Sequence, residues 1–254
     1  MKKYWRKILL ALLTAFPILI LVEHVLAKDQ KTIEWSGYTW TVKNSGTSKW
    51  GPGQNYWSSD KRDVWVDSRG RLHLKVVKRN GKWYSTELIN EKTLGYGTYR
   101  FLITGRPDKL DPNLVLGLFT YDEDSEDVKE KKYREIDIEF AKWGQVNGLN
   151  SSYTVLPYTM PENFLAFSTK LNSNYSTHSF TWTQKSINFK SYGHKSFKNP
   201  GNSSLLKNWS YKGKDIPDSK NEKVHINFWQ FEGKAPMNKK SAEIIIDRFV
   251  FTPY

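Results

Sequence analysis

The chain has 254 residues, no cysteine and a formal net charge of +13 at pH 7. The lack of cysteine excludes disulfides, thiol nucleophiles and thiolate metal sites, so burial alone must stabilise the fold. The 39 lysines and arginines are scattered rather than gathered in one stripe, which disfavours nucleic acid as a partner. The sequence holds 11 Trp, 14 Tyr and 13 Phe, which suit a core and also a sugar-binding surface, because the apolar face of a pyranose packs on an indole.

The first 27 residues have the pattern of a secretory signal. A basic segment (Lys2, Lys3, Arg6 and Lys7) precedes an uncharged, largely apolar run over residues 8–22, and Val25-Leu26-Ala27 offers a cleavage site. A spanning helix needs about 20 apolar residues, so this run is short for a membrane anchor, although an uncleaved anchor stays an alternative. Cleavage would remove four positive residues and Glu23 and leave residues 28–254 as one domain with a charge of +10. We expect this domain to be a secreted monomer, extracellular or periplasmic, without stable membrane association.

Beyond residue 30, short runs rich in β-branched and aromatic residues alternate with Gly, Asn, Asp and Pro. We predict strands over residues 72–77, 97–103, 114–121, 133–140, 153–156, 178–182, 187–192, 224–231 and 243–251. Hairpin turns are predicted at residues 67–70 and 79–82, and residues 199–218 are expected to form a long surface loop. The regular spacing of strands and turns predicts an all-β jelly-roll sandwich of two antiparallel sheets in a single domain.

The predicted strand around residues 135–140 alternates acidic and apolar side chains, Glu-Ile-Asp-Ile-Glu-Phe. Because side chains alternate across a strand, Glu135, Asp137 and Glu139 share one face at intervals of about 6.6 Å. Mutual repulsion raises the proton affinity of at least one of them. A retaining glycosidase needs one ionised and one protonated carboxyl group. The ionised carboxylate attacks the anomeric carbon, and the protonated one, about 5–5.5 Å away, donates its proton to the leaving oxygen. The alternative is a solvated acidic strand face without a catalytic role.

This motif and its flanks resemble glycoside hydrolase family 16, which includes lichenases, laminarinases, agarases and xyloglucan transglycosylases. The similar segments cover residues 51–57, 64–74, 95–99, 178–182, 187–189 and 226–229. The resemblance implies a jelly roll with an open cleft across its concave sheet. It also implies that Glu135 is the nucleophile, Glu139 the general acid/base and Asp137 a helper, with no cofactor required. The two-residue step from Asp137 to Glu139 is similar to the lichenase and transglycosylase form.

Two positions depart from the lichenase pattern. Arg134 stands where lichenases have Asp, and residues 141–144 (Ala-Lys-Trp-Gly) replace a Leu-Gly turn after the motif. The family also binds a structural calcium ion through an aspartate of the last strand in many members. Asp247 has that place in this sequence, and an ordinary surface aspartate is the alternative, so no metal site is assigned.

Substrate-binding candidates follow from strand parity and from the predicted cleft loop. Trp143 continues the face of the acidic strand, and Asn227 shares a face with Trp229 and Phe231 on a later strand. The remaining candidates are Asn55 and Trp57 on the loop and, more weakly, Tyr158. For each aromatic the alternative is core packing, and for His178 a structural role is favoured.

The sequence therefore predicts a secreted retaining hydrolase of a β-glucan-type polysaccharide. A transglycosylase of the same family and a non-catalytic lectin-like domain are the alternatives. The positive charge keeps a sulfated glycan open as a substrate, although the scattered lysines argue against it.

Overall fold

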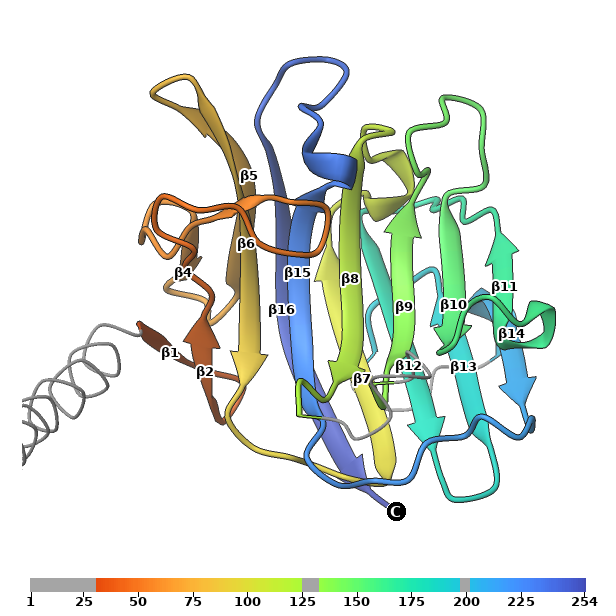
Figure 1. Ribbon diagram of the computed structural model, residues 1–254. Helices are drawn as coiled ribbons and strands as arrows, with labels where there is room; N and C mark the ends of the chain where they lie inside the picture. Colours follow the sequence, from red (N-terminus) through yellow and green to blue (C-terminus); the bar gives the residue numbers. More distant parts are fainter. Residues whose placement is uncertain (1–30, 125–132, 197–201) are drawn as a thin grey trace, which may run out of the picture. The chain divides into compact units, whose positions relative to one another are not determined.

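Sixteen strands and four short 3-10 helices make up the part of the chain that the computed structural model describes, which is residues 31–124, 133–196 and 202–254 (Figure 1). The predicted signal segment, residues 1–27, lies outside these ranges. The 3-10 helices are η1 (Pro107–Lys109), η3 (Pro161–Asn163), η4 (Asn202–Ser204) and η5 (Phe231–Gly233). Across the described residues there is no helix long and apolar enough to cross a membrane.

The front sheet in Figure 1 contains the acidic strand. It is antiparallel and has the order β1, β2, β6, β15, β8, β9, β10, β11. These strands are β1 (Thr32–Trp35), β2 (Tyr38–Val42), β6 (Lys82–Asn90), β15 (Lys223–Gln230), β8 (Leu114–Tyr121), β9 (Ile136–Ala141), β10 (Ser151–Val155) and β11 (Phe164–Phe167). The short β3 (Tyr56–Trp57) pairs with β6 in parallel.

The back sheet is also antiparallel and has the order β4, β5, β16, β7, β12, β13, β14. Its strands are β4 (Val64–Val66), β5 (Leu72–Arg79), β16 (Ala242–Pro253), β7 (Gly97–Thr104), β12 (Tyr175–Trp182), β13 (Ile187–Tyr192) and β14 (Leu205–Tyr211). The β5–β6 hairpin joins the two sheets, because β5 pairs with β16 and β6 pairs with β15.

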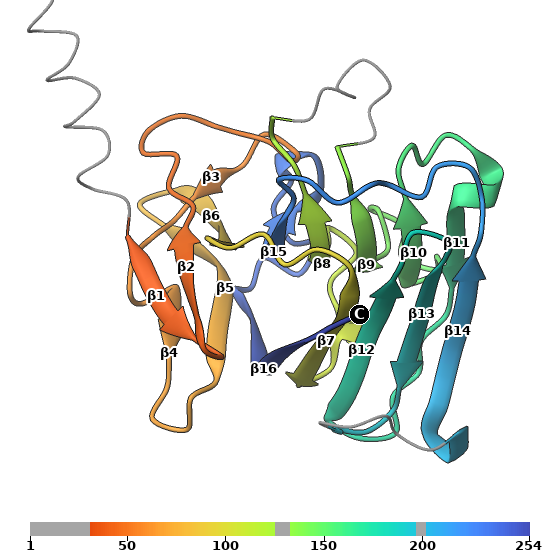
Figure 2. The same ribbon diagram turned by 90° about the horizontal axis from the view of Figure 1, so that it is seen from below.

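The two sheets face each other as layers in the view from below (Figure 2). Their facing sides bury one apolar core, in which Trp40, Trp182 and Phe228 are fully buried. Each such side chain stabilises the fold by roughly 1.5–3 kcal/mol through the apolar area that it removes from water. The predicted all-β jelly roll of two antiparallel sheets is confirmed.

Sequence patterns placed most of the strands correctly. The hairpin turn predicted at residues 79–82 forms between β5 and β6, where Asn80 and Gly81 take the positive φ angles (47° and 79°) that a tight hairpin turn requires. The long loop predicted over residues 199–218 is wrong for its middle part, which is β14. There Trp209 stacks on Phe189 with ring centroids 5.3 Å apart, and Tyr211 is buried. The packing of these aromatic rings makes the segment a strand despite its polar residues.

Candidate active site

The acidic strand places its carboxyl groups on the exposed side of the front sheet. Asp137 and Glu139 lie on β9, and Glu135 directly precedes it. The alternate residues Ile136, Ile138 and Phe140 are buried in the core, so the predicted two-sided pattern is present. The strand itself is shorter than predicted. Tyr133 and Arg134 have positive φ angles of 46° and 50°, which end the extended backbone before Glu135.

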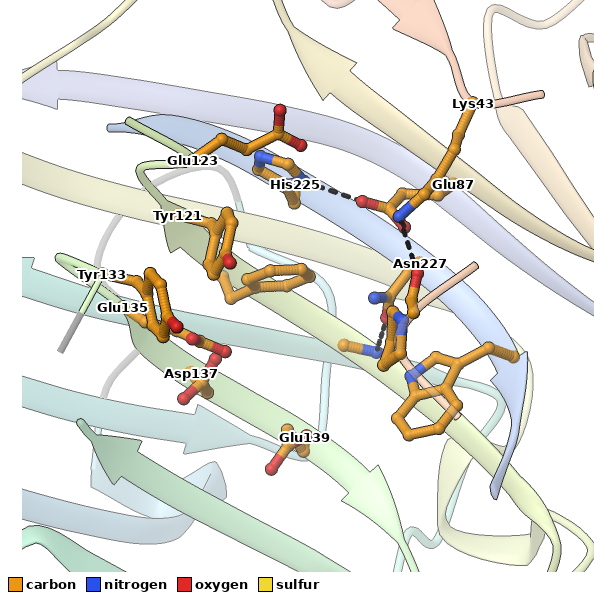
Figure 3. A pocket seen from close by; sticks show the side chains of 15 residues that line it. Lys43, Glu87, Tyr121, Glu123, Tyr133, Glu135, Asp137, Glu139, His225 and Asn227 are labelled. Carbon is orange, nitrogen blue, oxygen red and sulfur yellow. Dashed lines mark hydrogen bonds and ion pairs between the residues drawn. The ribbon is translucent and has the colours of Figure 1, made fainter. Parts of the chain in front are cut away.

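A cleft of about 600 Å³ opens over these carboxyl groups, and strands β6, β8, β9 and β15 form its floor. Glu135, Asp137 and Glu139 line one side of it, and Asn227 of β15 lies across from them (Figure 3). Trp229 of β15 also lines the cleft. The structure thus brings together all three predicted catalytic residues and two of the predicted substrate-binding residues. They come from segments about 90 residues apart in the sequence.

One row of side chains crosses the cleft floor in register. Glu139 pairs with Gly117 on β8, Gly117 with Asn227 on β15, and Asn227 with Glu87 on β6. The Asn227 Oδ1 accepts a hydrogen bond of 3.1 Å from the Gly117 backbone N–H. A Cβ at Gly117 would lie 2.5 Å from this same oxygen. Glycine therefore keeps the floor open between the acid Glu139 and the amide of Asn227.

The three carboxyl groups do not all ionise at neutral pH. Burial, with repulsion from Glu139, raises the pKa of Glu135 to about 8, and burial raises the pKa of Glu139 to about 7. Burial and both glutamates raise the pKa of Asp137 well above its usual value. Asp137 therefore keeps its proton to higher pH than an ordinary aspartate, and Glu135 and Glu139 titrate as a coupled pair that holds one proton between pH 7 and pH 8.

Hydrogen bonds distinguish the two glutamates. The carboxyl of Asp137 is hydrogen-bonded to Glu135, which lowers the pKa of Glu135 and raises that of Asp137. Figure 3 shows these two carboxyl groups close together, with Glu139 further along the strand. Glu139 instead accepts a hydrogen bond of 3.2 Å from the Ser152 hydroxyl on β10. The hydrogen bond with Asp137 stabilises the Glu135 anion but does not reverse the order of the two pKa values, so Glu139 ionises before Glu135 in the free cleft. The assignment of Glu135 as the nucleophile therefore rests on the resemblance found in the sequence.

A buried chain of charges on the cleft floor was missed by the sequence interpretation. The Glu87 carboxylate lies 2.8 Å from Lys43 Nζ and 2.8 Å from His225 Nδ1. Burial opposes ionisation of Glu87, but the hydrogen bond from His225 and the charge of Lys43 outweigh it and lower the pKa of Glu87. This group therefore places a fixed anion in the cleft beside Asn227. Only the alternation of Glu87 on its strand could have indicated it.

Aromatic side chains flank the carboxyl groups at both ends of the cleft. Beyond Glu139, Trp229 packs against Trp143 with ring centroids 6.3 Å apart, and Trp143 contacts Phe231 at 5.5 Å. Of these three, Trp229 lines the cleft itself. Phe231 was predicted on the same strand, but it lies in η5 just after β15 ends. Trp143 is half-buried, with a positive φ of 51° in the turn after β9.

At the other end of the cleft, Tyr121 stacks on Tyr133 with ring centroids 5.2 Å apart. Phe119 lies 5.0 Å from the His225 ring. All four rings line the cleft, and the sequence interpretation did not select any of them. Their polar and aromatic surfaces suit a sugar ring, which offers both apolar faces and hydroxyl groups.

Three of the five predicted substrate-binding residues do not line the cleft. Trp143 packs behind Trp229, and the prediction for Asn55 and Trp57 is corrected. Asn55 is 1% exposed: its amide donates to the carbonyls of Pro52 and Gln230. Trp57 is also 1% exposed, and its Nε1–H donates to the Trp50 carbonyl. Both therefore hold the loop over residues 51–57 in place and offer no surface to a sugar. Tyr158 is exposed but does not line the cleft either.

Arg134, the departure just before Glu135, is a buried anchor. Its Nη1 lies 2.8 Å from Asp122 Oδ2, and its Nε donates to the Asp218 carbonyl at 3.1 Å. The Thr120 hydroxyl donates to the Arg134 carbonyl at 2.9 Å. These contacts bind the segment before β9 to the end of β8, so Arg134 fixes the position of Glu135 without lining the cleft.

Asp247 and His178 both have partners within the protein. Asp247 accepts a hydrogen bond of 2.6 Å from Thr104 and lies 3.1 Å from Lys195 Nζ, so a cation of the protein itself occupies the position next to it. Two more residues of this surface, Arg71 and Arg248, are also cationic, and this donor set does not fit calcium. His178 is buried in the core, where burial lowers its pKa to about 3 and its Nδ1 lies 2.8 Å from the Ser191 hydroxyl, so its role is structural.

Three solved structures share this arrangement of strands. The β-glucanase of Bacillus licheniformis superposes with a TM-score of 0.58 at 16% identity, over 89% of this chain and 100% of that one. Rv0315 of Mycobacterium tuberculosis, described as an immunostimulatory antigen and pseudo β-1,3-glucanase, superposes with a TM-score of 0.60 at 13% identity, over 84% and 91%. A glycosyl hydrolase family 16 protein of Mycobacterium smegmatis superposes with a TM-score of 0.56 at 14% identity, over 84% and 90%.

This chain has the fold of the family 16 β-glucanases. The likeness extends over most of the chain and confirms, for the fold, the resemblance found in the sequence. No protein-family model matches the sequence, and no curated protein matches it at a significant level. Because the family 16 fold is found both in β-glucanases and in a protein described as a pseudo-glucanase, activity must be argued from the cleft of this chain.

Proposed function

We propose that this protein is a secreted glycoside hydrolase that cleaves a β-glucan-type polysaccharide with retention of configuration. The observation that carries the proposal is the row of three carboxyl groups, Glu135, Asp137 and Glu139, that line one cleft, with Asp137 hydrogen-bonded to Glu135. Three acids buried together without a partner cation cost stability, and folding alone gives no reason to keep them. An acid and a nucleophile on opposite sides of one bond give such a reason.

The proposed reaction has two displacements. Glu135 attacks the anomeric carbon as an anion while Glu139 donates its proton to the leaving oxygen, which forms a glycosyl–enzyme ester and releases the first product. Glu139, now ionised, takes a proton from water, and that water attacks the anomeric carbon and frees Glu135. Asp137 donates its hydrogen bond to Glu135 whenever Glu135 is an anion, and so stabilises it before attack and after release. The reaction requires no cofactor.

The flanking aromatic side chains support a polysaccharide as the substrate. Trp229 lies beyond Glu139, and the Tyr121–Tyr133 pair lies beyond Glu135, so aromatic surfaces are present on both sides of the reacting groups. The cleft is open to solvent along the front sheet, so a long chain could lie across it. A β-glucan is the substrate class that the family 16 fold favours.

The test measures release of reducing ends from mixed-linkage β-glucan and laminarin by residues 28–254 and by the Glu135→Gln variant. We expect the wild type to release product and the variant to lose nearly all activity, because the amide cannot attack carbon. Equal release by the two proteins would contradict the proposal. Tight binding of a glucan by the wild type without any product would instead establish the lectin-like alternative, and products longer than the starting chains would establish the transglycosylase.

A further inference from the structure

The strand next to the acidic strand carries two hydroxyl groups opposite the carboxyl groups. β10 pairs with β9 so that Ser152 lies opposite Glu139 and Thr154 lies opposite Asp137. Ser152 is 2% exposed and Thr154 is 3% exposed, so both are buried. Because cross-strand neighbours have Cβ atoms about 4.5–5.5 Å apart, each hydroxyl is within reach of the acid opposite it.

The two hydroxyl groups differ in what they bind. Ser152 donates a hydrogen bond of 3.2 Å to Glu139. The Thr154 Oγ1 has no hydrogen-bond partner within the described part of the chain, although it is buried. Its neighbour on the other side, Phe164 of β11, has no side-chain group that could bind it. A buried hydroxyl without a partner costs stability, and such a group in a native fold calls for a functional explanation.

Asp137 needs a second partner during the proposed reaction. In the free cleft its carboxyl group is hydrogen-bonded to Glu135 (Figure 3). Once Glu135 is an ester with the sugar, it is no longer an anion. The neighbouring anion is then Glu139, which has just given up its proton. A hydrogen bond from Asp137 would stabilise this anion and make it a weaker base toward water, so the second displacement requires that another group hold Asp137.

We propose that Thr154 is a positioning residue, whose hydroxyl accepts the hydrogen bond of Asp137 while the glycosyl–enzyme ester exists. The proton stays on Asp137 throughout, so no covalent bond forms or breaks at Thr154. Glu139 is thereby left to take the proton of the attacking water. This inference rests on the proposed two-step hydrolysis and adds to it a residue that acts in the second step.

The test variant is Thr154→Val in residues 28–254, because valine keeps the shape of threonine and lacks the hydroxyl. The substrate is a dinitrophenyl β-glycoside of a β-glucan oligosaccharide, whose leaving group departs without help from an acid. Stopped-flow release of dinitrophenolate separates the two steps, since a burst reports the first and the steady phase reports the second.

Two further variants accompany this test. Thr154→Ser restores a hydroxyl at the same position and serves as the rescue. Ser176→Ala on β12 is the matched control, because it removes from the back sheet a buried hydroxyl that likewise has no partner among the described residues.

We expect Thr154→Val to show a burst and then a steady rate about tenfold below that of the wild type, because part of the general-base contribution is lost. Its kcat/KM should stay within about twofold of the wild type, since this ratio reports only the steps up to the ester, and KM should fall with kcat. Thr154→Ser and Ser176→Ala should behave as the wild type does. Thr154→Val should unfold at the same or a higher temperature, because an apolar group replaces an unpaired hydroxyl.

Two results would overturn this inference while the proposed function stands. One is a wild-type steady rate in Thr154→Val, and the other is an equal loss of kcat and kcat/KM, which a purely structural role would produce. No release of dinitrophenolate by the wild type would instead overturn the proposed function, and this inference with it. If Thr154→Val does not fold, Thr154→Ala takes its place, with the same split between kcat and kcat/KM expected.

Discussion

At the scale of single residues, the acidic strand combines three carboxyl groups with different partners. Asp137 is hydrogen-bonded to Glu135, and Ser152 to Glu139. The same burial that raises all three pKa values also removes water from the place where charge would develop. In the proposed mechanism, environment more than residue type separates the acid from the nucleophile on this strand.

This coupling predicts the pH dependence of kcat/KM. Activity needs one proton on the Glu135–Glu139 pair, so it should fall below about pH 7, where both are protonated, and above about pH 8, where both are ionised. In Glu139→Gln, measured with an aryl glycoside whose leaving group needs no acid, the alkaline fall should disappear. The acidic fall should stay at about the same pH, because Glu139 is already protonated in that range and does not repel Glu135.

The measurement is initial rate against pH for the wild type and for Glu139→Gln on the same aryl glycoside. Glu162→Gln, an exposed glutamate in η3, is the matched control and should reproduce the wild-type profile. An alkaline fall that persists in Glu139→Gln would show that another group supplies the acid.

Gly117 should be the least tolerant residue of the cleft floor. An added Cβ would lie 2.5 Å from Asn227 Oδ1, closer than side-chain carbons are normally found. We expect Gly117→Ala to destabilise the protein by about 1–3 kcal/mol and to lower activity, because Asn227 must move. Chemical unfolding and glucan hydrolysis measure the two effects.

A double-mutant cycle separates the clash from other effects. In an Asn227→Ala background the oxygen is gone, so the cost of adding Gly117→Ala should fall by at least about half. An unchanged cost in that background would place the strain elsewhere.

At the scale of elements, the position of the acidic strand depends on the residue before it. Arg134 is 3% exposed and lies 2.8 Å from Asp122, which is 2% exposed. Removing one member leaves the other charge buried without compensation, at a cost of about 3–5 kcal/mol. Arg134→Gln should therefore lower both stability and kcat, since Glu135 is the next residue along the chain.

The informative comparison is with the double variant Arg134→Gln/Asp122→Asn, in which two amides replace the ion pair. Thermal unfolding should show the double variant to be more stable than Arg134→Gln alone. Equal losses of stability in the two variants would show that Arg134 does not stabilise the protein through its ion pair with Asp122.

The individual strands differ in how well the sequence predicts them. Strands such as β8 and β13 were predicted with their observed bounds, because β8 is a long, largely apolar run and β13 alternates Ile187 and Phe189 with polar residues. β14 was missed because polar residues interrupt its alternation, and only its packing on β13 reveals it. A strand with a clear local pattern can be predicted from the sequence, whereas a strand that forms only by packing on its neighbour cannot.

The residues of the cleft could likewise be predicted only where they are close together in the sequence. Glu135, Asp137 and Glu139 were predicted because they are neighbours on one strand. The pair of Glu87 and His225 is 138 residues apart in the sequence, and its members meet only through the registers of β6 and β15. Asn55 and Trp57 were assigned to the wrong environment, because a loop sequence does not show which of its side chains turn inward.

At the scale of the whole molecule, the three buried carboxyl groups make folding depend on pH. In the unfolded chain they ionise near pH 4, whereas in the folded protein the pKa of Glu139 is raised to about 7 and that of Glu135 to about 8. A raised pKa favours the folded state most at low pH. Its contribution is therefore fully present below about pH 4 and is lost as the pH rises to about 8.

Replacing one of these acids by its neutral amide should consequently stabilise the protein at high pH only. We expect Glu139→Gln to have a higher Tm than the wild type at pH 8, where each kcal/mol corresponds to roughly 2–4 °C. At about pH 3, where Glu139 is protonated in both the folded and the unfolded state, the two proteins should have the same Tm. Thermal unfolding at both values measures the difference, with Glu162→Gln as the exposed control. A variant less stable than the wild type at pH 8 would mean that ionised Glu139 stabilises the fold. Burial of the three acids would then not cost stability, and the main argument for their catalytic role would be lost.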